Sequence, residues 1–129
     1  MMKDLSFFIT DKGTSFIGMD ACPKAKLVCG SDNKEYTAVK VGSVDAAKEK
    51  HVPVIAVDGT TVTVSVGSVT HPMEEDHYIV WICLKTEKGF QVKTLKPHDK
   101  PEAKFSITAD DKVIEAYEFC NKHGVWSGK

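Results

Sequence analysis

The sequence predicts an all-β protein, an immunoglobulin-like β-sandwich or barrel preceded by a small β-rich subdomain. Two observations lead to this prediction. From residue 52 onward, short segments alternate apolar and polar side chains with the period of a β-strand. Turn signals separate these segments, as in a β-sandwich. The 129 residues are enough for about one ordinary domain, and a composition of 42% hydrophobic and 27% charged residues is typical of a globular protein.

Strands and turns alternate along the larger part of the chain. Asp58-Gly59 is a favoured two-residue hairpin turn and joins the first two segments. The second segment has valine at every other position, which predicts a strand with one buried face and one solvent-exposed face. The last segment contains helix formers, but its length and its neighbours favour a strand. The predicted strands are Val52–Val57, Thr61–Val66, Tyr78–Lys85, Phe90–Leu95, Ala103–Thr108 and Val113–Phe119.

The first forty residues have a different pattern. Their apolar residues are weakly periodic, and Gly13, Gly18, Pro23 and Gly30 interrupt them repeatedly. We therefore expect a small, loop-rich N-terminal subdomain with short strands over residues 1–40 and a larger domain over residues 41–129.

Charge and hydropathy exclude several classes of function. Seventeen basic residues against eighteen acidic ones give a formal charge of -1, which offers no footprint for nucleic acid or an anionic membrane. No apolar run approaches a membrane span, and Leu5–Ile9 is too short for a secretory signal. We therefore expect a cytoplasmic protein, in which the four cysteines serve metal ligation, catalysis or burial rather than disulfides.

Histidine and cysteine residues lie at the predicted strand ends. His51 follows a charged run and begins a strand, His71 and His77 bracket a proline-containing loop, and Cys120 and His123 form a Cys-x-x-His after the last strand. A rigid β scaffold can bring side chains from such positions to one point. Imidazole and thiolate are ligands of iron, zinc, copper and nickel rather than of calcium or magnesium. The pattern therefore indicates a metal site.

The number of candidate ligands bears on the metal. Structural zinc takes four ligands, so five candidates are one too many. Blue copper needs a weak axial ligand such as methionine, and Met73 could serve only from a distant loop. Five donors on a six-coordinate metal leave one position open, which suits redox chemistry on a small molecule at iron. His98, in the Lys96–Lys100 loop, is expected to be an ordinary surface residue.

Residues 40–129 resemble the superoxide reductases, also called desulfoferrodoxins or neelaredoxins, with motif order and spacing intact. The resemblance is carried by Glu49–Pro53, Gly67–Val69 followed by His71–Met73, His77–Ile79 with Trp81-Ile82, and Cys120–Gly124 with Trp126. Several motifs coincide, which makes the likeness highly specific.

The resemblance implies a mononuclear iron centre with one iron per chain. His51, His71, His77 and His123 would be its equatorial ligands and Cys120 its axial thiolate. The sixth position would face solvent and take superoxide, which is reduced with one electron and two protons to hydrogen peroxide. Rubredoxin or a similar donor would return the electron, and family members are often oligomers, so we expect a homodimer.

Two further residues acquire roles through the same resemblance. Lys50 matches the family residue that attracts superoxide and helps to deliver a proton. Glu49 matches the glutamate that closes over the ferric iron as a sixth ligand after turnover.

The N-terminal part departs from the two-iron members of the family. It has only Cys22 and Cys29, whereas a second, rubredoxin-like iron needs four thiolates. We therefore expect this subdomain to be a metal-free remnant that serves packing or dimer contact, as in the treponemal-type members. Cys83 lies in mid-strand and is expected to be buried.

Three alternatives remain open at this point. The same iron could act as a superoxide dismutase, because the balance depends on how fast the donor reduces it. The chain could be a non-enzymatic one-electron carrier, although a carrier needs no open coordination position. It could also bind structural zinc without turnover.

Overall fold

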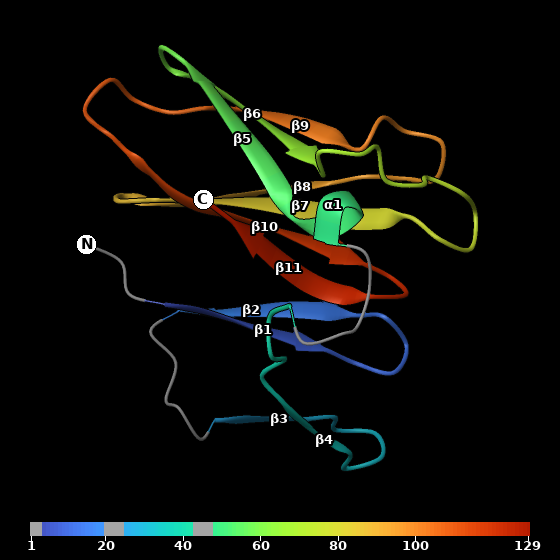
Figure 1. The fold of residues 1–129 in the computed structure, drawn as a ribbon. Helices are drawn as coiled ribbons and strands as arrows, with labels where there is room; N and C mark the ends of the chain where they lie inside the picture. The colour runs from blue at the N-terminus through green and yellow to red at the C-terminus, as the bar shows by residue number, and fades with distance from the viewer. Residues whose placement is uncertain (1–3, 20–24, 43–47) are drawn as a thin grey trace. The chain divides into compact units, whose positions relative to one another are not determined.

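A computed structural model describes residues 4–19, 25–42 and 48–129 of the chain. The protein divides into two compact units, Met1–Lys40 and Val41–Lys129. Apart from one short helix, the regular elements of the described residues are β-strands, so the predicted all-β fold is confirmed (Figure 1). Among these residues, no helix has the length and apolar character that crossing a membrane would require.

The N-terminal unit contains two antiparallel hairpins. One pairs β1 (Leu5–Ile9) with β2 (Ser15–Met19), and the other pairs β3 (Lys26–Val28) with β4 (Glu35–Thr37). The backbone N–H of Val39 donates to the carbonyl of Phe7 at 2.8 Å and ties the end of the unit to β1. The short strands expected in this region are therefore present.

The larger unit is built from two antiparallel sheets, with strand orders β11-β10-β7-β8 and β5-β6-β9 (Figure 1). The sheets pack together, because β5 contacts β10 and β11 while β7 contacts β6 and β9. The elements are α1 (Lys48–His51), β5 (Pro53–Asp58), β6 (Thr61–Val66), β7 (Ile79–Thr86), β8 (Gly89–Thr94), β9 (Glu102–Ser106), β10 (Val113–Cys120) and β11 (Gly124–Gly128).

The core lies between these two sheets, where the alternation of β6 places its valines. Val62, Val64 and Val66 are buried, whereas Thr63 and Ser65 are only half-buried. Residues of the facing sheet, among them Ile82 and Leu84, complete the cluster. Burying one such aliphatic side chain contributes about 1.5–3 kcal/mol, so this core holds the sheets whose ends carry the site.

All six predicted strands exist, including the ambiguous last one, with ends shifted by at most two residues. The turn between β5 and β6 is Gly59-Thr60 rather than Asp58-Gly59, because Asp58 pairs with Thr61 and belongs to the strand. Gly59 has a φ of 61°, a conformation that glycine adopts without steric cost.

Two elements were not predicted. The segment from Lys48 to His51 is a short helix, so His51 ends α1 instead of beginning a strand. Residues Gly124–Gly128 form β11, which pairs with β10 along its whole length. Neither segment has a strong local preference for its structure; both are held by contacts with other parts of the fold.

Candidate metal centre

Four imidazole rings form a closed cycle at one end of the larger unit. Ring centroids lie 4.6 Å apart for His51 and His71, 4.9 Å for His71 and His77, 5.1 Å for His77 and His123, and 4.9 Å for His123 and His51. Each ring meets its neighbours edge to face, at interplanar angles of 66–83°. The four rings therefore surround a common centre.

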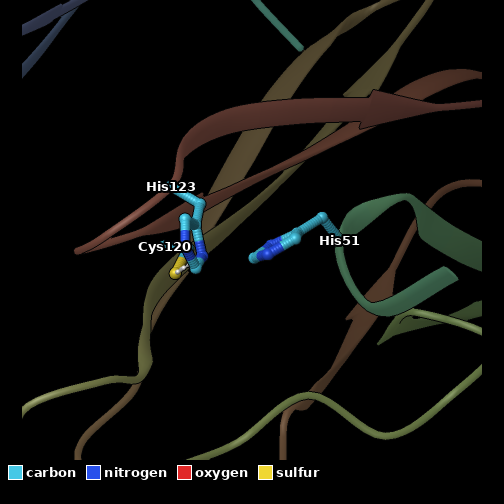
Figure 2. A group of neighbouring side chains, drawn as sticks. All are labelled: His51, Cys120 and His123. Atoms are coloured by element: carbon cyan, nitrogen blue, oxygen red, sulfur yellow. Dashed lines mark hydrogen bonds between the residues drawn. The ribbon is translucent and has the colours of Figure 1, made fainter. Parts of the chain in front are cut away.

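These histidines come from four separate places in the fold. His51 ends α1, and His71 and His77 lie at the two ends of the loop between β6 and β7. His123 lies in the turn between β10 and β11, three residues after Cys120 ends β10. Figure 2 shows His51 directed across the site toward Cys120 and His123. Only the folded chain brings these groups together.

The Cys120 sulfur belongs to the same constellation. Ligand atoms of His51, Cys120 and His123 lie within 4.8 Å of one another, and so do those of His71, His77 and Cys120. The sulfur lies 3.9 Å from Nδ1 of His123. A register shift between β10 and β7 falls between Phe119 and Cys120, at the end of the strand. Four nitrogens and one sulfur thus converge.

Unpartnered nitrogens show that the cluster fits a metal ion. His71 Nδ1 lies 2.7 Å from the carbonyl oxygen of Pro72. A carbonyl oxygen only accepts hydrogen bonds, so Nδ1 carries the proton, and Nε2 keeps a lone pair that can bind a metal. Buried His71 Nε2 and His77 Nε2 have no hydrogen-bond partner among the described residues. Buried polar atoms are otherwise almost always satisfied, so these two atoms are expected to have a ligand.

The size of the cycle agrees with this interpretation. A square with edges of about 4.9 Å has its centre about 3.5 Å from each corner, which is close to one metal–nitrogen bond of about 2.1 Å plus the radius of an imidazole ring. The donor set, imidazole with one thiol, suits iron, zinc or copper and not calcium or magnesium.

Burial favours the neutral form of three of the rings, His51, His71 and His77, and metal ligation requires that form. Burial is the largest cause that lowers the pKa of His51 to about 4, with smaller contributions from the other three rings and Lys50. Burial is also the main cause that lowers the pKa values of His71 and His77. A neutral ring keeps the lone pair that a cation needs, so the protein itself prepares these groups for a metal.

The pKa of the Cys120 thiol is shifted in opposite directions by burial and by hydrogen bonds. Burial raises the pKa of its thiol, while hydrogen bonds from the backbone N–H groups of Lys122 and His123 to the sulfur lower it. Such bonds stabilise the thiolate once a metal neutralises its charge. The turn after β10 therefore both supplies His123 and solvates the sulfur.

Asn121 fastens the loop that carries His77. Its backbone N–H donates to the carbonyl of Tyr78 at 3.2 Å, and its side-chain oxygen accepts from the Tyr78 N–H at 2.9 Å. Its amide nitrogen donates to the carbonyl of Asp76 at 3.0 Å. The residues on both sides of His77 are thus tied to the turn that carries Cys120 and His123.

The loop after β6 holds the helix that carries His51. The carbonyl oxygen of Glu49 accepts hydrogen bonds from the backbone N–H of Val69 at 2.9 Å and from the hydroxyl of Ser68 at 3.3 Å. Gly67 lies so close to this turn that a Cβ there would be 2.5 Å from the same carbonyl oxygen. The position of His51 therefore depends on a residue without a side chain at position 67.

The remaining candidates lie outside the ring cycle. Glu49 and Lys50 are exposed on α1, and the charge of Lys50 is one of the causes that lower the pKa values of three site histidines. His98 is exposed and lies 3.2 Å from Glu75, as expected for a surface residue. Cys83 is fully buried in β7, and burial raises its pKa to about 12.

In the N-terminal unit, Cys29 is half-buried, and its sulfur lies 3.1 Å from the Ser31 hydroxyl. Cys22 lies outside the described residues.

Two residues contact His51 in a way that the sequence did not predict: Glu118 was not singled out, and Trp126 was named only as part of the family motif. Glu118 is fully buried, with Oε1 at 3.4 Å from His51 Nδ1, and the Trp126 ring stacks on His51 at 5.2 Å. The signal for Glu118 was available: in a strand, side chains two residues apart point the same way, so Glu118 shares the face of Ala116 and Cys120. A carboxylate on that apolar face beside a candidate ligand was the clue.

Comparison with known proteins agrees with the site. The family model described as Desulfoferrodoxin matches residues 43–129, which include all five converging donors. The chain belongs to the desulfoferrodoxin family. The desulfoferrodoxin of Nitratidesulfovibrio vulgaris is 50% identical over 101 residues, covering 78% of this chain and 76% of that protein. The desulfoferrodoxin of Clostridium acetobutylicum is 35% identical over 126 residues, covering 98% of this chain and 97% of that protein.

A solved structure resembles the whole desulfoferrodoxin-family chain. The crystal structure of the superoxide reductase from Treponema pallidum matches with a TM-score of 0.89 and 57% identity, covering 98% of this chain and 100% of that one. The family resemblance inferred from the sequence motifs, including the likeness to treponemal-type members, is thereby confirmed.

Proposed function

We propose that this chain is a superoxide reductase with one mononuclear non-haem iron. The observation that carries the proposal is the convergence of four imidazole rings and one thiol on a single centre. Structural zinc takes four ligands, whereas five donors on a six-coordinate metal leave one position for a small substrate. The similarity to a protein named superoxide reductase supports the same activity.

His51, His71, His77 and His123 would hold the iron through ring nitrogens, and Cys120 through its thiolate. When bound, the iron supplies one electron to superoxide, which takes up two protons and leaves as hydrogen peroxide. The chain's part is to present neutral rings and a hydrogen-bonded sulfur in a fixed arrangement. Hydrogen bonds to the backbone hold α1 and the loop between β6 and β7, some of them made by the Asn121 side chain, so little reorganisation is needed when the metal binds.

Lys50 would attract the substrate. Its side chain is exposed on α1, and its charge already acts on the site histidines. A cation beside the site raises the local concentration of an anion such as superoxide, and it can hold a water molecule that supplies a proton. Lys50→Ala should lower the rate constant for superoxide consumption about 10-fold at low salt and flatten its salt dependence. Lys48→Ala, on the same short helix, is the matched control. Equal rates for the two variants contradict a role for Lys50.

Glu49 would close over the site in the oxidised protein. Its side chain is exposed one residue before Lys50, while its carbonyl is fixed by Val69 and Ser68. Replacing it with alanine keeps these backbone bonds and removes only the carboxylate. The visible absorption spectrum of the oxidised protein should shift in Glu49→Ala, and an identical spectrum contradicts the assignment.

Metal counting and superoxide kinetics test the activity as a whole. Protein purified without air should contain about one iron per chain and little zinc or copper, and pulses of superoxide should be consumed without release of oxygen. Release of one oxygen for every two superoxide ions consumed would identify a dismutase instead. Absence of superoxide consumption by the iron-loaded protein would favour a one-electron carrier, and stoichiometric zinc that iron cannot replace would refute the reductase.

Four further points belong to the proposal. Rubredoxin or a similar protein would re-reduce the iron, the chain would form a homodimer, and the protein would be cytoplasmic. Residues 1–40 would be a metal-free remnant, because Cys22 and Cys29 are two thiolates where a rubredoxin-like iron needs four. An iron count near two per chain would contradict a metal-free N-terminal unit.

The packing of two antiparallel sheets in residues 41–129 supports the immunoglobulin-like description of the catalytic domain.

A further inference from the structure

Glu118 stands out among the described polar residues of the larger unit. Its side chain is 0% exposed, and neither carboxylate oxygen has a hydrogen-bond partner among the described residues. A buried carboxyl group that makes no hydrogen bond opposes folding, so packing alone does not explain its presence.

The carboxyl group of Glu118 lies opposite the ring of His51. Oε1 of Glu118 lies 3.4 Å from Nδ1 of His51, and this nitrogen also lacks a hydrogen-bond partner in the described structure. The unpartnered nitrogen and the unpartnered oxygen therefore face each other. The separation exceeds the approximately 2.8 Å of a formed bond between an N–H and a carboxylate, so a small shift would complete the bond.

Trp126 restrains the same imidazole from its face. The two rings are stacked, with centroids 5.2 Å apart and an angle of 16° between their planes. Trp126 and Glu118 are direct cross-strand partners in the pairing of β10 with β11. The indole N–H also donates to the carbonyl of His123 at 2.9 Å. The ring of His51 is thus contacted on its face by β11 and at its Nδ1 edge by β10.

We propose that Glu118 is a positioning residue for His51: its carboxylate accepts a hydrogen bond from Nδ1–H and leaves Nε2 as the atom that binds the metal. The inference rests on the proposed function, because it takes the ring cycle to be a metal centre. Ligating histidines commonly donate their second N–H to a carboxylate, which fixes the tautomer and strengthens the ligand.

Charge balance gives Glu118 a second effect. A divalent cation bound by neutral rings and the Cys120 thiolate keeps one positive charge in a buried place. The carboxylate of Glu118, two residues before Cys120 on the same face of β10, cancels that charge. The carboxyl group therefore opposes folding of the metal-free protein and favours binding of the metal.

Because Glu118 should disfavour folding of the metal-free protein but favour metal binding, the test measures both stability and metal affinity. The variants are Glu118→Gln, which removes the charge, and Glu118→Leu, which removes charge and acceptor. Glu115→Gln is the matched control, because Glu115 lies on the same strand but is half-buried and hydrogen-bonded to the Tyr117 hydroxyl at 2.7 Å. Titration of the metal-free full chain with Co²⁺, followed by thiolate-to-cobalt absorption, gives the dissociation constant. Thermal unfolding without metal gives the stability.

We expect Co²⁺ binding to weaken about 10- to 100-fold in both Glu118 variants, more in the leucine variant, and less than 2-fold in the control. The metal-free Glu118 variants should unfold at the same temperature as the wild type or higher. Unchanged Co²⁺ affinity overturns the proposal. So does a loss of affinity accompanied by a loss of metal-free stability, because this is the result expected of a residue that only packs.

The titration separates this inference from the proposed function. Co²⁺ binding involves neither superoxide nor an electron donor. If the wild type binds Co²⁺, the Glu118 variants bind it weakly, and the iron-loaded wild type does not consume superoxide, only the proposed function fails. If the iron-loaded protein reduces superoxide but the variants bind Co²⁺ normally, only the role of Glu118 fails. A wild type that binds no Co²⁺ contradicts the metal centre itself.

Discussion

Replacing Gly67 with alanine should displace the helical turn that carries His51. A Cβ at this position would lie 2.5 Å from the carbonyl oxygen of Glu49 and 2.8 Å from the carbonyl carbon of Lys50. Ordinary contacts between such atoms are about 3.5–4.0 Å long, so the α1 backbone must move away by about 1 Å. Both atoms belong to backbone, which cannot rotate aside as a flexible side chain can. The shift is therefore passed on to His51.

The expected cost has two parts. Overpacking of this kind costs about 1–3 kcal/mol. Moving α1 also lengthens the hydrogen bond from the Val69 N–H to the Glu49 carbonyl, now 2.9 Å, and its loss adds about 1 kcal/mol. The free energy of unfolding should thus fall by about 2–4 kcal/mol, which corresponds to a decrease of about 10 °C in the melting temperature of a domain of this size.

Thermal unfolding and Co²⁺ titration of the full chain measure the two consequences. Gly67→Ala should melt about 10 °C lower and bind Co²⁺ about 10-fold more weakly or worse, because one ligand is misplaced. Gly89→Ala is the control, since a Cβ there meets nothing within 4 Å and the residue has no positive φ. The reasoning is refuted if Gly67→Ala melts within about 2 °C of Gly89→Ala and binds Co²⁺ as tightly as that control.

Three more outcomes can be checked directly. Asn121→Ala removes two of the three hydrogen bonds that hold the residues beside His77, so Co²⁺ should dissociate several-fold faster when stopped-flow mixing with a chelator measures its release. An unchanged dissociation rate contradicts the role of Asn121 in holding this loop. Cys83 should resist alkylation in the folded protein, because burial raises its pKa to about 12; rapid labelling seen by peptide mass spectrometry contradicts its burial. Hydrogen bonds, chiefly from Lys88, lower the pKa of Asp110 to about 2, so its contribution to stability is present above pH 4 or so and is lost as the pH falls toward 2. Acid unfolding should therefore show the stabilities of the wild type and Asp110→Asn converging as the pH falls to about 2, and a constant difference contradicts this pair.

Six strands of the larger unit, β5 to β10, were predictable because their signal is local. Side chains of a strand alternate between two faces, so the valines of Thr61–Val66 reveal a half-buried strand without knowledge of its partners. The same holds for the buried Cys83 and the exposed His98, whose surroundings follow from a mid-strand and a loop position.

α1 and β11 were not predictable, for a physical reason that they share. A helix as short as Lys48–His51 cannot form alone, because its nucleation costs more than one turn returns. It exists because the loop after β6 binds its Glu49 carbonyl. Gly124–Gly128 begins and ends with glycine, which weakens a strand, and becomes one only by pairing with β10.

The sequence by itself determined the kind of chemistry this protein can perform. Imidazole and thiol donors stand at the ends of strand-forming segments, and their types alone select iron, zinc or copper over calcium or magnesium. Tertiary structure alone decided that four rings close into a cycle around Cys120, and that Glu118 and Trp126 hold the ring of His51. The reason is that donor chemistry belongs to each residue. Distances between residues more than seventy positions apart, such as His51 and Trp126, depend on strand register and sheet packing, which the whole chain sets together.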